Sequence, residues 1–216
     1  MKKQNHRIPL SPFRKHVSEW ENCTRCELGN RARKPCIFRG KIPCDVLFVG
    51  EAPGKSENAI GIPFVPGAPA GKKLEWIIQN ATVGSNAQGV KWTWGITNVL
   101  GCLPTDDRKQ KLDTPDEWDF KWIETCQPRL EEIVKIANPS LIIAVGKTAS
   151  DLLEQGVTTG PTFHKKIPVQ RITHPAAILR RPSATRSLDF ENEAIVVEEA
   201  VVRTLGKKKR QLRIKR

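Results

Sequence analysis

Four short apolar segments restrict the fold of this chain more than any other feature. They occupy residues 45–50, 95–100, 140–146 and 167–173. Each has the length of a buried strand. Segments with helical periodicity follow the first, second and fourth of them, at residues 71–80, from Thr114 onward and at residues 191–205. A short helical segment that ends near Gly156 follows the third. Such alternation favours a parallel sheet with helices on both faces. We therefore predict an α/β fold, a three-layer α/β/α sandwich around a central, mainly parallel four-stranded sheet.

The chain length and the helix boundaries indicate one domain followed by a tail. Thr114 begins the sequence Thr-Pro-Asp-Glu, which combines an N-cap residue, a proline at the first helical position and an acid. Gly206 follows the final helical pattern, and glycine commonly ends a helix. A chain of 216 residues is long enough for one full core. We predict a domain over residues 1–206 and a basic C-terminal tail over residues 207–216.

The strongly basic composition indicates the class of partner. The chain has 36 Lys and Arg against 23 Asp and Glu, a formal net charge of +13. Seven of the basic residues lie in the last ten, and the rest of the chain is basic as well. A polyanion, such as a nucleic acid, is the partner that this charge favours. A solvated tail without a specific role is the alternative for the last ten residues.

The sequence contains no signal for a membrane. No segment approaches the roughly 20 apolar residues of a membrane span. The first residues, Met-Lys-Lys-Gln, lack the apolar stretch of a signal peptide. We expect a cytoplasmic protein, in which paired cysteines are more often metal ligands than disulfides.

Cys23-Thr-Arg-Cys26 is a C-x2-C pair of the kind that opens many metal sites. Its spacing is compatible with two sets of further ligands. Cys36 and Cys44 would complete a local zinc site, whereas Cys102 and Cys126 would tie the start of the chain to its middle. Spacing alone leaves both sets open.

Three residues with chemically useful side chains lie where the predicted strands end. Glu51 follows the first strand, Asn98 lies near the end of the second, and His174 follows the fourth. In open parallel sheets, ligands bind beyond the carboxyl ends of the strands. An acid, an amide and an imidazole are therefore expected to share one pocket.

Four motifs in order give the chain a family resemblance. They are Gly50-Glu-Ala-Pro-Gly54, Gly61-Ile-Pro-Phe-Val65, Thr97-Asn98-Val99 and His174-Pro-Ala-Ala-Ile-Leu-Arg180. With the cysteines, they resemble the uracil-DNA glycosylase superfamily over about residues 20–182, most closely its family-4 branch with an iron–sulfur cluster. The resemblance implies a [4Fe–4S] cluster as cofactor, with the ligands Cys23, Cys26, Cys102 and Cys126. Cys36 would then be a loop thiol and Cys44 a buried one.

The resemblance also implies how uracil would be excised from DNA by hydrolysis, the first step of base-excision repair. His174 would donate a hydrogen bond to the base oxygen that gains negative charge. Asn98 would read the edge of the flipped base, and Phe64 would stack on it. Glu51 would orient or activate water, with Glu57 as a second candidate. The first motif would line the pocket through Gly50, Ala52, Pro53 and Gly54.

The segment after His174 would contact DNA according to the same resemblance. Leu179 and Arg180 would probe the DNA after base flipping, and Ser183 and Arg186 would meet phosphates. The substrate would be uracil-containing DNA, single- or double-stranded. The enzyme would act as a monomer and without a Schiff base.

Departures from the family pattern leave two alternatives open. Asn58 stands where the branch usually has an acid, and the sequence around Cys102 lacks a basic residue often found beside that cysteine. The segments 64–71 and 102–126 are longer than usual. One alternative is a glycosylase for another damaged or hypermodified pyrimidine. The other is an iron–sulfur DNA-binding module without catalysis.

Overall fold

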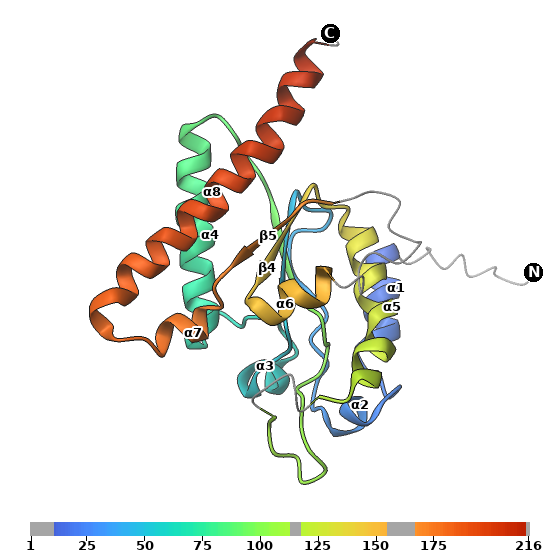
Figure 1. Cartoon of the computed structure of the whole chain (residues 1–216). Helices are drawn as coiled ribbons and strands as arrows, with labels where there is room; N and C mark the ends of the chain where they lie inside the picture. The colour runs from blue at the N-terminus through green and yellow to red at the C-terminus, as the bar shows by residue number, and fades with distance from the viewer. Residues whose placement is uncertain (1–10, 113–117, 155–166, 215–216) are drawn as a thin grey trace, which may run out of the picture.

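A five-stranded sheet forms the middle of the molecule (Figure 1). The computed structural model describes residues 11–112, 118–154 and 167–214, with side chains as far as Lys207. The strands are β1 (Arg39–Gly40), β2 (Val46–Gly50), β3 (Trp94–Asn98), β4 (Leu141–Val145) and β5 (Val169–Ile172), in the spatial order β1-β3-β2-β4-β5. β2 to β5 are parallel, and β1 pairs with β3 in the antiparallel sense.

The mainly parallel sheet confirms the predicted fold class, and the strand count needs correction from four to five. The added strand, β1, has only two residues. A segment this short carries no measurable alternation of apolar and polar residues. It forms because the backbone of Arg39 and Gly40 lies opposite Ile96 and Gly95 at the edge of β3.

Helices cover both faces of the sheet, which confirms the three-layer sandwich (Figure 1). One face carries α4 (Pro69–Ala87), α7 (Pro175–Leu179) and α8 (Ser183–Ile214). The other carries α1 (Pro12–Trp20), α2 (Glu27–Arg31), α5 (Phe120–Ala137) and α6 (Lys147–Leu152). The short helix α3 (Lys55–Ile60) follows β2. Among the described residues, no helix is both long and apolar enough to cross a membrane.

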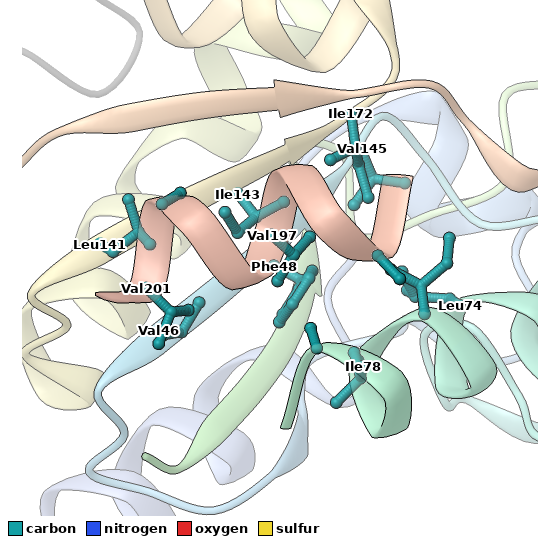
Figure 2. Packing of buried hydrophobic residues seen from close by; sticks show 14 of the residues in the cluster. Val46, Phe48, Leu74, Ile78, Leu141, Ile143, Val145, Ile172, Val197 and Val201 are labelled. Atoms are coloured by element: carbon teal, nitrogen blue, oxygen red, sulfur yellow. The ribbon is translucent and has the colours of Figure 1, made fainter. Parts of the chain in front are cut away.

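The central strands β2 and β4 consist of apolar residues and glycine because both of their faces are buried. In β2, Val46 and Phe48 pack with α4 and α8, as Figure 2 shows. Leu47 and Val49 point to the opposite face and pack with α5. Successive strand residues alternate between faces, so a sheet covered on both sides needs apolar residues throughout. These two cores hold the carboxyl ends of the strands in a fixed arrangement.

Two predicted helix boundaries, the start of α5 and the end of α8, need comment. α5 begins at Phe120, where Asp119 accepts a 2.9 Å hydrogen bond from the Lys121 amide. The predicted start at Thr114 lies outside the described residues. α8 begins at Ser183 and continues through Gly206 to Ile214, so the predicted stop at Gly206 is wrong. One helical glycine costs only about 1 kcal/mol, and the Lys and Arg residues that follow are good helix formers. The division into a domain and a tail remains a prediction.

Candidate active site

Gly50 and Asn98 face each other at the carboxyl ends of β2 and β3. A Cβ atom on Gly50 would lie 2.4 Å from Asn98 Oδ1 and 2.6 Å from Phe64 Cε2. Both distances are far below van der Waals contact. Only glycine at this position leaves room for the amide and the aromatic ring together, so these three residues pack closely at the carboxyl edge of the sheet.

The side chain of Asn98 is fully buried, with 0% exposure, and its polar atoms are unused. Neither Nδ2 nor Oδ1 has a hydrogen-bond partner among the described residues. A buried polar group without a partner costs about 1–3 kcal/mol. An amide offers two donors and an acceptor. The site thus presents a donor and an acceptor that a polar ligand can satisfy.

Phe64 adopts an unusual backbone conformation beside this amide. Its φ of 47° lies in the left-handed region, which a residue with a bulky side chain rarely adopts. The ring is buried, and its centroid lies 5.5 Å from that of His174, with 38° between the ring planes. Strained backbone that the surrounding structure holds in place is common at ligand sites. The conformation brings an aromatic face and an imidazole to the same place.

Glu57 holds the first two motifs together. Its carboxylate accepts hydrogen bonds from the backbone amides of Gly54 and Phe64, one on each oxygen. Burial raises the pKa of Glu57, against the opposing effects of these hydrogen bonds and of the charges on Arg39 and Lys111. Glu57 therefore fixes the conformation of Phe64 through its backbone.

His174 is the N-cap of α7, and its environment defines how the ring is protonated. Nδ1 accepts a 3.1 Å hydrogen bond from the Ala176 amide, so the proton of the neutral ring is on Nε2. Burial lowers the pKa of His174 to about 4, and the positive charges of Arg180 and Lys111 act in the same direction. Gly146 leaves room for the ring, because a Cβ there would lie 3.2 Å from His174 Cβ. The imidazole is a neutral donor at ordinary pH.

The other predicted pocket residues lie along the same edge of the sheet. Glu51 follows β2, is half-buried, and accepts a 2.9 Å hydrogen bond from the Leu100 amide through its carbonyl. Ala52 is half-buried, Pro53 is buried, and Gly54 is the N-cap of α3. The first motif therefore runs from the end of β2 into α3 and borders the Asn98 amide.

The predicted DNA-contacting residues lie in one stretch that follows His174. Leu179 ends α7 and packs against the core, whereas Arg180 is exposed. Ser183 is exposed and begins α8. Arg186 is half-buried, and its Nε donates a 2.7 Å hydrogen bond to the Arg181 carbonyl. This hydrogen bond limits the freedom of Arg186 to reach a phosphate.

The four widely spaced cysteines line a single pocket. Cys23 follows α1, Cys26 is the N-cap of α2, Cys102 follows β3, and Cys126 lies on α5. The rest of the wall includes the side chains of Trp20, Leu28, Leu100 and Trp122. Cys126 Sγ accepts hydrogen bonds from the Gly101 amide at 3.3 Å and from Arg129 Nε at 3.2 Å. The fold thus brings the predicted ligand set together.

The two remaining cysteines lie elsewhere in the core. Cys36 has 0% exposure, and burial raises the pKa of its thiol to about 12. Cys44 is buried before β2, where burial likewise raises the pKa of its thiol to about 12. Neither lines the pocket that Cys23 and Cys26 share with Cys102 and Cys126. The geometry therefore favours the widely spaced set over the local one.

Sequence reasoning missed Arg129 and Lys111. Arg129 is buried on α5 beside Cys126, and its only sequence signal is a basic residue among the apolar positions of a helix. The charge of Lys111 acts on both Glu57 and His174. Lys111 belongs to a turn closed by a bridge to Thr105, in a charged stretch that periodicity does not place.

The parallel sheet thus carries an amide, an aromatic ring and an imidazole at its carboxyl edge. The sequence model of the uracil DNA glycosylase superfamily matches residues 38–196. The chain therefore belongs to the uracil DNA glycosylase superfamily.

Individual relatives are consistent with this assignment. The type-4 uracil-DNA glycosylase of Archaeoglobus fulgidus is 33% identical over 193 residues, which cover 83% of this chain and 89% of that protein. The type-4 uracil-DNA glycosylase of Pyrobaculum aerophilum is 31% identical over 177 residues, with 76% and 82% covered. A crystal structure of wild-type Pedobacter heparinus SMUG2 shares the fold, with a TM-score of 0.52 and 13% identity over 71% of this chain and 74% of that one.

Proposed function

We propose that this protein is a monofunctional uracil-DNA glycosylase, which hydrolyses the bond between uracil and deoxyribose and begins base-excision repair. The observation that carries the proposal is the buried, unpartnered amide of Asn98 between Gly50 and Phe64. Uracil presents an N–H donor flanked by carbonyl acceptors, which an amide can match with its oxygen and its NH2 group. The relatives named type-4 uracil-DNA glycosylases support the same substrate.

Each pocket residue has a distinct role in this reaction. A flipped uracil stacks on Phe64 and pairs with Asn98. As the bond between C1′ of the sugar and N1 of uracil breaks, negative charge grows on the base, and the Nε2–H of His174 stabilises it at a uracil oxygen. Water adds to C1′, which yields free uracil and an abasic site. No lysine takes part and no Schiff base forms.

Glu51 and Glu57 divide the carboxylate roles. Both oxygens of Glu57 already accept backbone hydrogen bonds from Gly54 and Phe64. Glu57 therefore acts as a positioning group for these two segments. Glu51 lies at the end of β2 without such commitments among the described residues, and we assign it the orientation of the attacking water and the acceptance of its proton.

The four-cysteine pocket fits a [4Fe–4S] cluster. Four thiols line a pocket that is otherwise mainly apolar. The N–H groups of Gly101 and Arg129 donate hydrogen bonds to Cys126 Sγ, as is typical around cluster sulfurs. When bound, the cluster supplies a covalent brace between α2, the segment after β3, and α5.

The DNA would lie against the stretch from Leu179 to Arg186, which follows the catalytic His174. Arg180 is exposed, and Ser183 begins α8, so both can reach a backbone phosphate. We assign the wedge that replaces a flipped base to Leu179, and we expect the enzyme to act as a cytoplasmic monomer. If this stretch needs a second DNA strand in order to bind, the enzyme prefers double-stranded DNA; otherwise it also acts on single-stranded DNA.

An oligonucleotide with a single uracil tests the function. We expect wild-type protein to convert it to an abasic site and Asn98→Ala to reduce the rate roughly 100-fold or more, because the pocket loses its base-reading groups. Asn80→Ala is the matched control, since Asn80 is an exposed helical amide that bonds the Trp76 carbonyl. DNA binding without release of uracil would reject the proposal, and release of another pyrimidine alone would change the substrate.

A further inference from the structure

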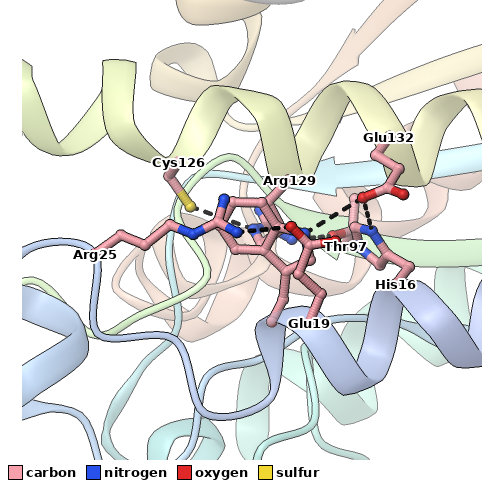
Figure 3. A network of polar contacts seen from close by, with 8 residues as sticks. His16, Glu19, Arg25, Thr97, Cys126, Arg129 and Glu132 are labelled. Carbon is pink, nitrogen blue, oxygen red and sulfur yellow. Dashed lines mark hydrogen bonds and ion pairs between the residues drawn. The ribbon is translucent and has the colours of Figure 1, made fainter.

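Arg129 places a positive charge inside the core, between the four-cysteine pocket and the candidate active site. Its exposure is 1%. Nε donates to Cys126 Sγ at 3.2 Å, and Nη1 donates to Thr97 Oγ1 at 3.2 Å. Nη2 donates to the carbonyls of Asn98 and Val99, the latter at 2.9 Å. Figure 3 shows the guanidinium between Cys126 and Thr97.

No carboxylate among the described residues pairs with this charge. Glu132, three residues further along α5, instead contacts His16 Nδ1 at 2.8 Å (Figure 3). It also accepts a 3.4 Å hydrogen bond from Trp20 Nε1. A buried charge without a counter-charge is strongly destabilising. The carbonyl and hydroxyl oxygens around Arg129 offset it only in part. A thiolate at Cys126, as a cluster ligand, would supply the missing negative charge.

Gly101 provides the space that Arg129 occupies. A Cβ on Gly101 would lie 3.0 Å from Arg129 Nε, closer than nearly all real approaches of this kind. The Gly101 amide also donates to Cys126 Sγ at 3.3 Å, and its carbonyl accepts a 2.6 Å hydrogen bond from the Cys36 amide. The segment that follows Asn98 is therefore fitted closely around the guanidinium and the sulfur.

We propose that Arg129 is a positioning residue that couples the four-cysteine site to the base-reading end of β3. Its planar fork holds the backbone of Asn98 and Val99 at a fixed distance from Cys126, and so sets where the Asn98 amide stands. Its charge also offsets the negative charge of the thiolate cluster. The inference rests on the proposed cluster and the proposed uracil pocket.

The coupling predicts two effects of replacing Arg129, one on the cluster and one on uracil binding. Replacement of a merely structural residue would not produce both. Removal of a nearby positive charge makes reduction of a negatively charged cluster less favourable, so the midpoint potential of the cluster falls. Removal of the guanidinium leaves the carbonyls of Asn98 and Val99 without its hydrogen bonds, so the end of β3 is held less firmly. Binding of free uracil should therefore weaken, although Arg129 does not touch the base. Coupling between sites is typically 5- to 150-fold in affinity.

The test uses protein that is purified without oxygen and contains its iron–sulfur cluster. Wild-type protein is measured first for iron and for release of uracil, and failure there would refute the proposed function rather than this coupling. Arg129→Gln removes the charge, Arg129→Lys keeps it but lacks the fork, and Glu132→Gln is the control on the same helix. For each we would measure iron per chain, the midpoint potential without DNA, and the inhibition constant for free uracil.

We expect Arg129→Gln to lower the potential and to raise the inhibition constant about fivefold or more. Arg129→Lys should keep a potential near that of wild type while its inhibition constant rises similarly. Glu132→Gln should change neither quantity. An unchanged potential together with an unchanged inhibition constant in loaded Arg129→Gln would overturn the proposal, as would equal changes in Glu132→Gln.

Gly101→Ala decides the question if both Arg129 variants lose iron or fail to fold. The added methyl group displaces the guanidinium by a few tenths of an ångström and removes none of the side chains that contact Arg129. A lower potential with weaker uracil inhibition supports the coupling. Wild-type values of both quantities in the loaded Gly101→Ala protein contradict it.

Discussion

The ring centroid of Phe64 lies 5.5 Å from that of His174, although the two residues belong to different motifs on different elements. Glu57 sets the backbone of Phe64 through a hydrogen bond to its amide, and the Ala176 amide sets the tautomer of His174. Phe64 thus has the neutral hydrogen-bond donor His174 beside it, and Gly50 lies next to both Phe64 and the Asn98 amide. Such preorganisation is how an enzyme stabilises charge that develops in a transition state.

Gly50 should tolerate no side chain. Gly50→Ala would place a methyl group 2.4 Å from Asn98 Oδ1, so the amide and the Phe64 ring must move apart. We expect the rate of uracil release to fall roughly 100-fold, since displacement of catalytic groups by about 1 Å can cost that much. Gly67→Ala is the control, because a Cβ there has no neighbour within 4 Å. Equal activity of the two variants would place the base elsewhere.

The rate should be insensitive to pH where histidine normally titrates. Burial lowers the pKa of His174 to about 4, so the imidazole stays neutral from pH 8 down to about 5. The unfolded chain takes up this proton near pH 6.5, so the folded state loses stability as pH falls from 6.5 towards 4. Single-turnover rates of uracil release between pH 8 and 5 check the first point. A tenfold fall between pH 7 and 5.5, absent in His174→Gln, would show a normal pKa.

Replacement of the six cysteines by alanine, one at a time, should give two classes of variant that differ in iron content. Cys102→Ala is expected to lose the iron, because it removes one of the four thiols that line the shared pocket. Cys44→Ala is expected to keep about four iron atoms per chain, because Cys44 lies in the core away from that pocket. Iron analysis and the visible absorption of protein purified without oxygen distinguish them. An iron-free Cys44→Ala beside an iron-loaded Cys102→Ala would reverse the assignment.

The end of α8 should contribute to DNA affinity through charge alone. The last ten residues contain seven Lys and Arg, and the helix reaches Ile214. Deletion of residues 207–216 should flatten the dependence of log affinity on log salt by about 0.9 for each phosphate that the shortened protein no longer neutralises. The single-turnover rate on bound oligonucleotide should stay the same. An unchanged slope would mean that the tail is solvated and does not touch DNA.

The fold was largely predictable because its signals are local. Buried parallel strands leave continuous apolar runs, and their alternation with helices determines the layers. β1 escaped prediction because two residues make no pattern, and the Gly206 stop failed because flanking helix formers outweigh one glycine. The predicted strand ends also placed Glu51, Asn98 and His174 at one edge of the sheet, since parallel strands end at the same edge.

The interactions that organise the site were not predictable from the sequence. Glu57 accepts hydrogen bonds from two backbone amides, and one of them belongs to Phe64, whose left-handed conformation no residue pattern indicates. Arg129 reaches Cys126 and the end of β3 only after α5 has packed on the sheet. The spacing of the cysteines in the chain suited both sets. The family resemblance implied the widely spaced set, and the tertiary structure brings those four cysteines to one pocket.

Release of uracil by His174→Ala under single-turnover conditions tests the central claim most directly. The account predicts that wild-type protein releases one uracil per site and leaves an abasic site that borohydride does not trap on the protein. In His174→Ala, the rate of uracil release should be at least about 100-fold lower, because the imidazole is removed. Binding of the same DNA should persist in the variant. A rate of uracil release in His174→Ala equal to that of wild type would contradict the account.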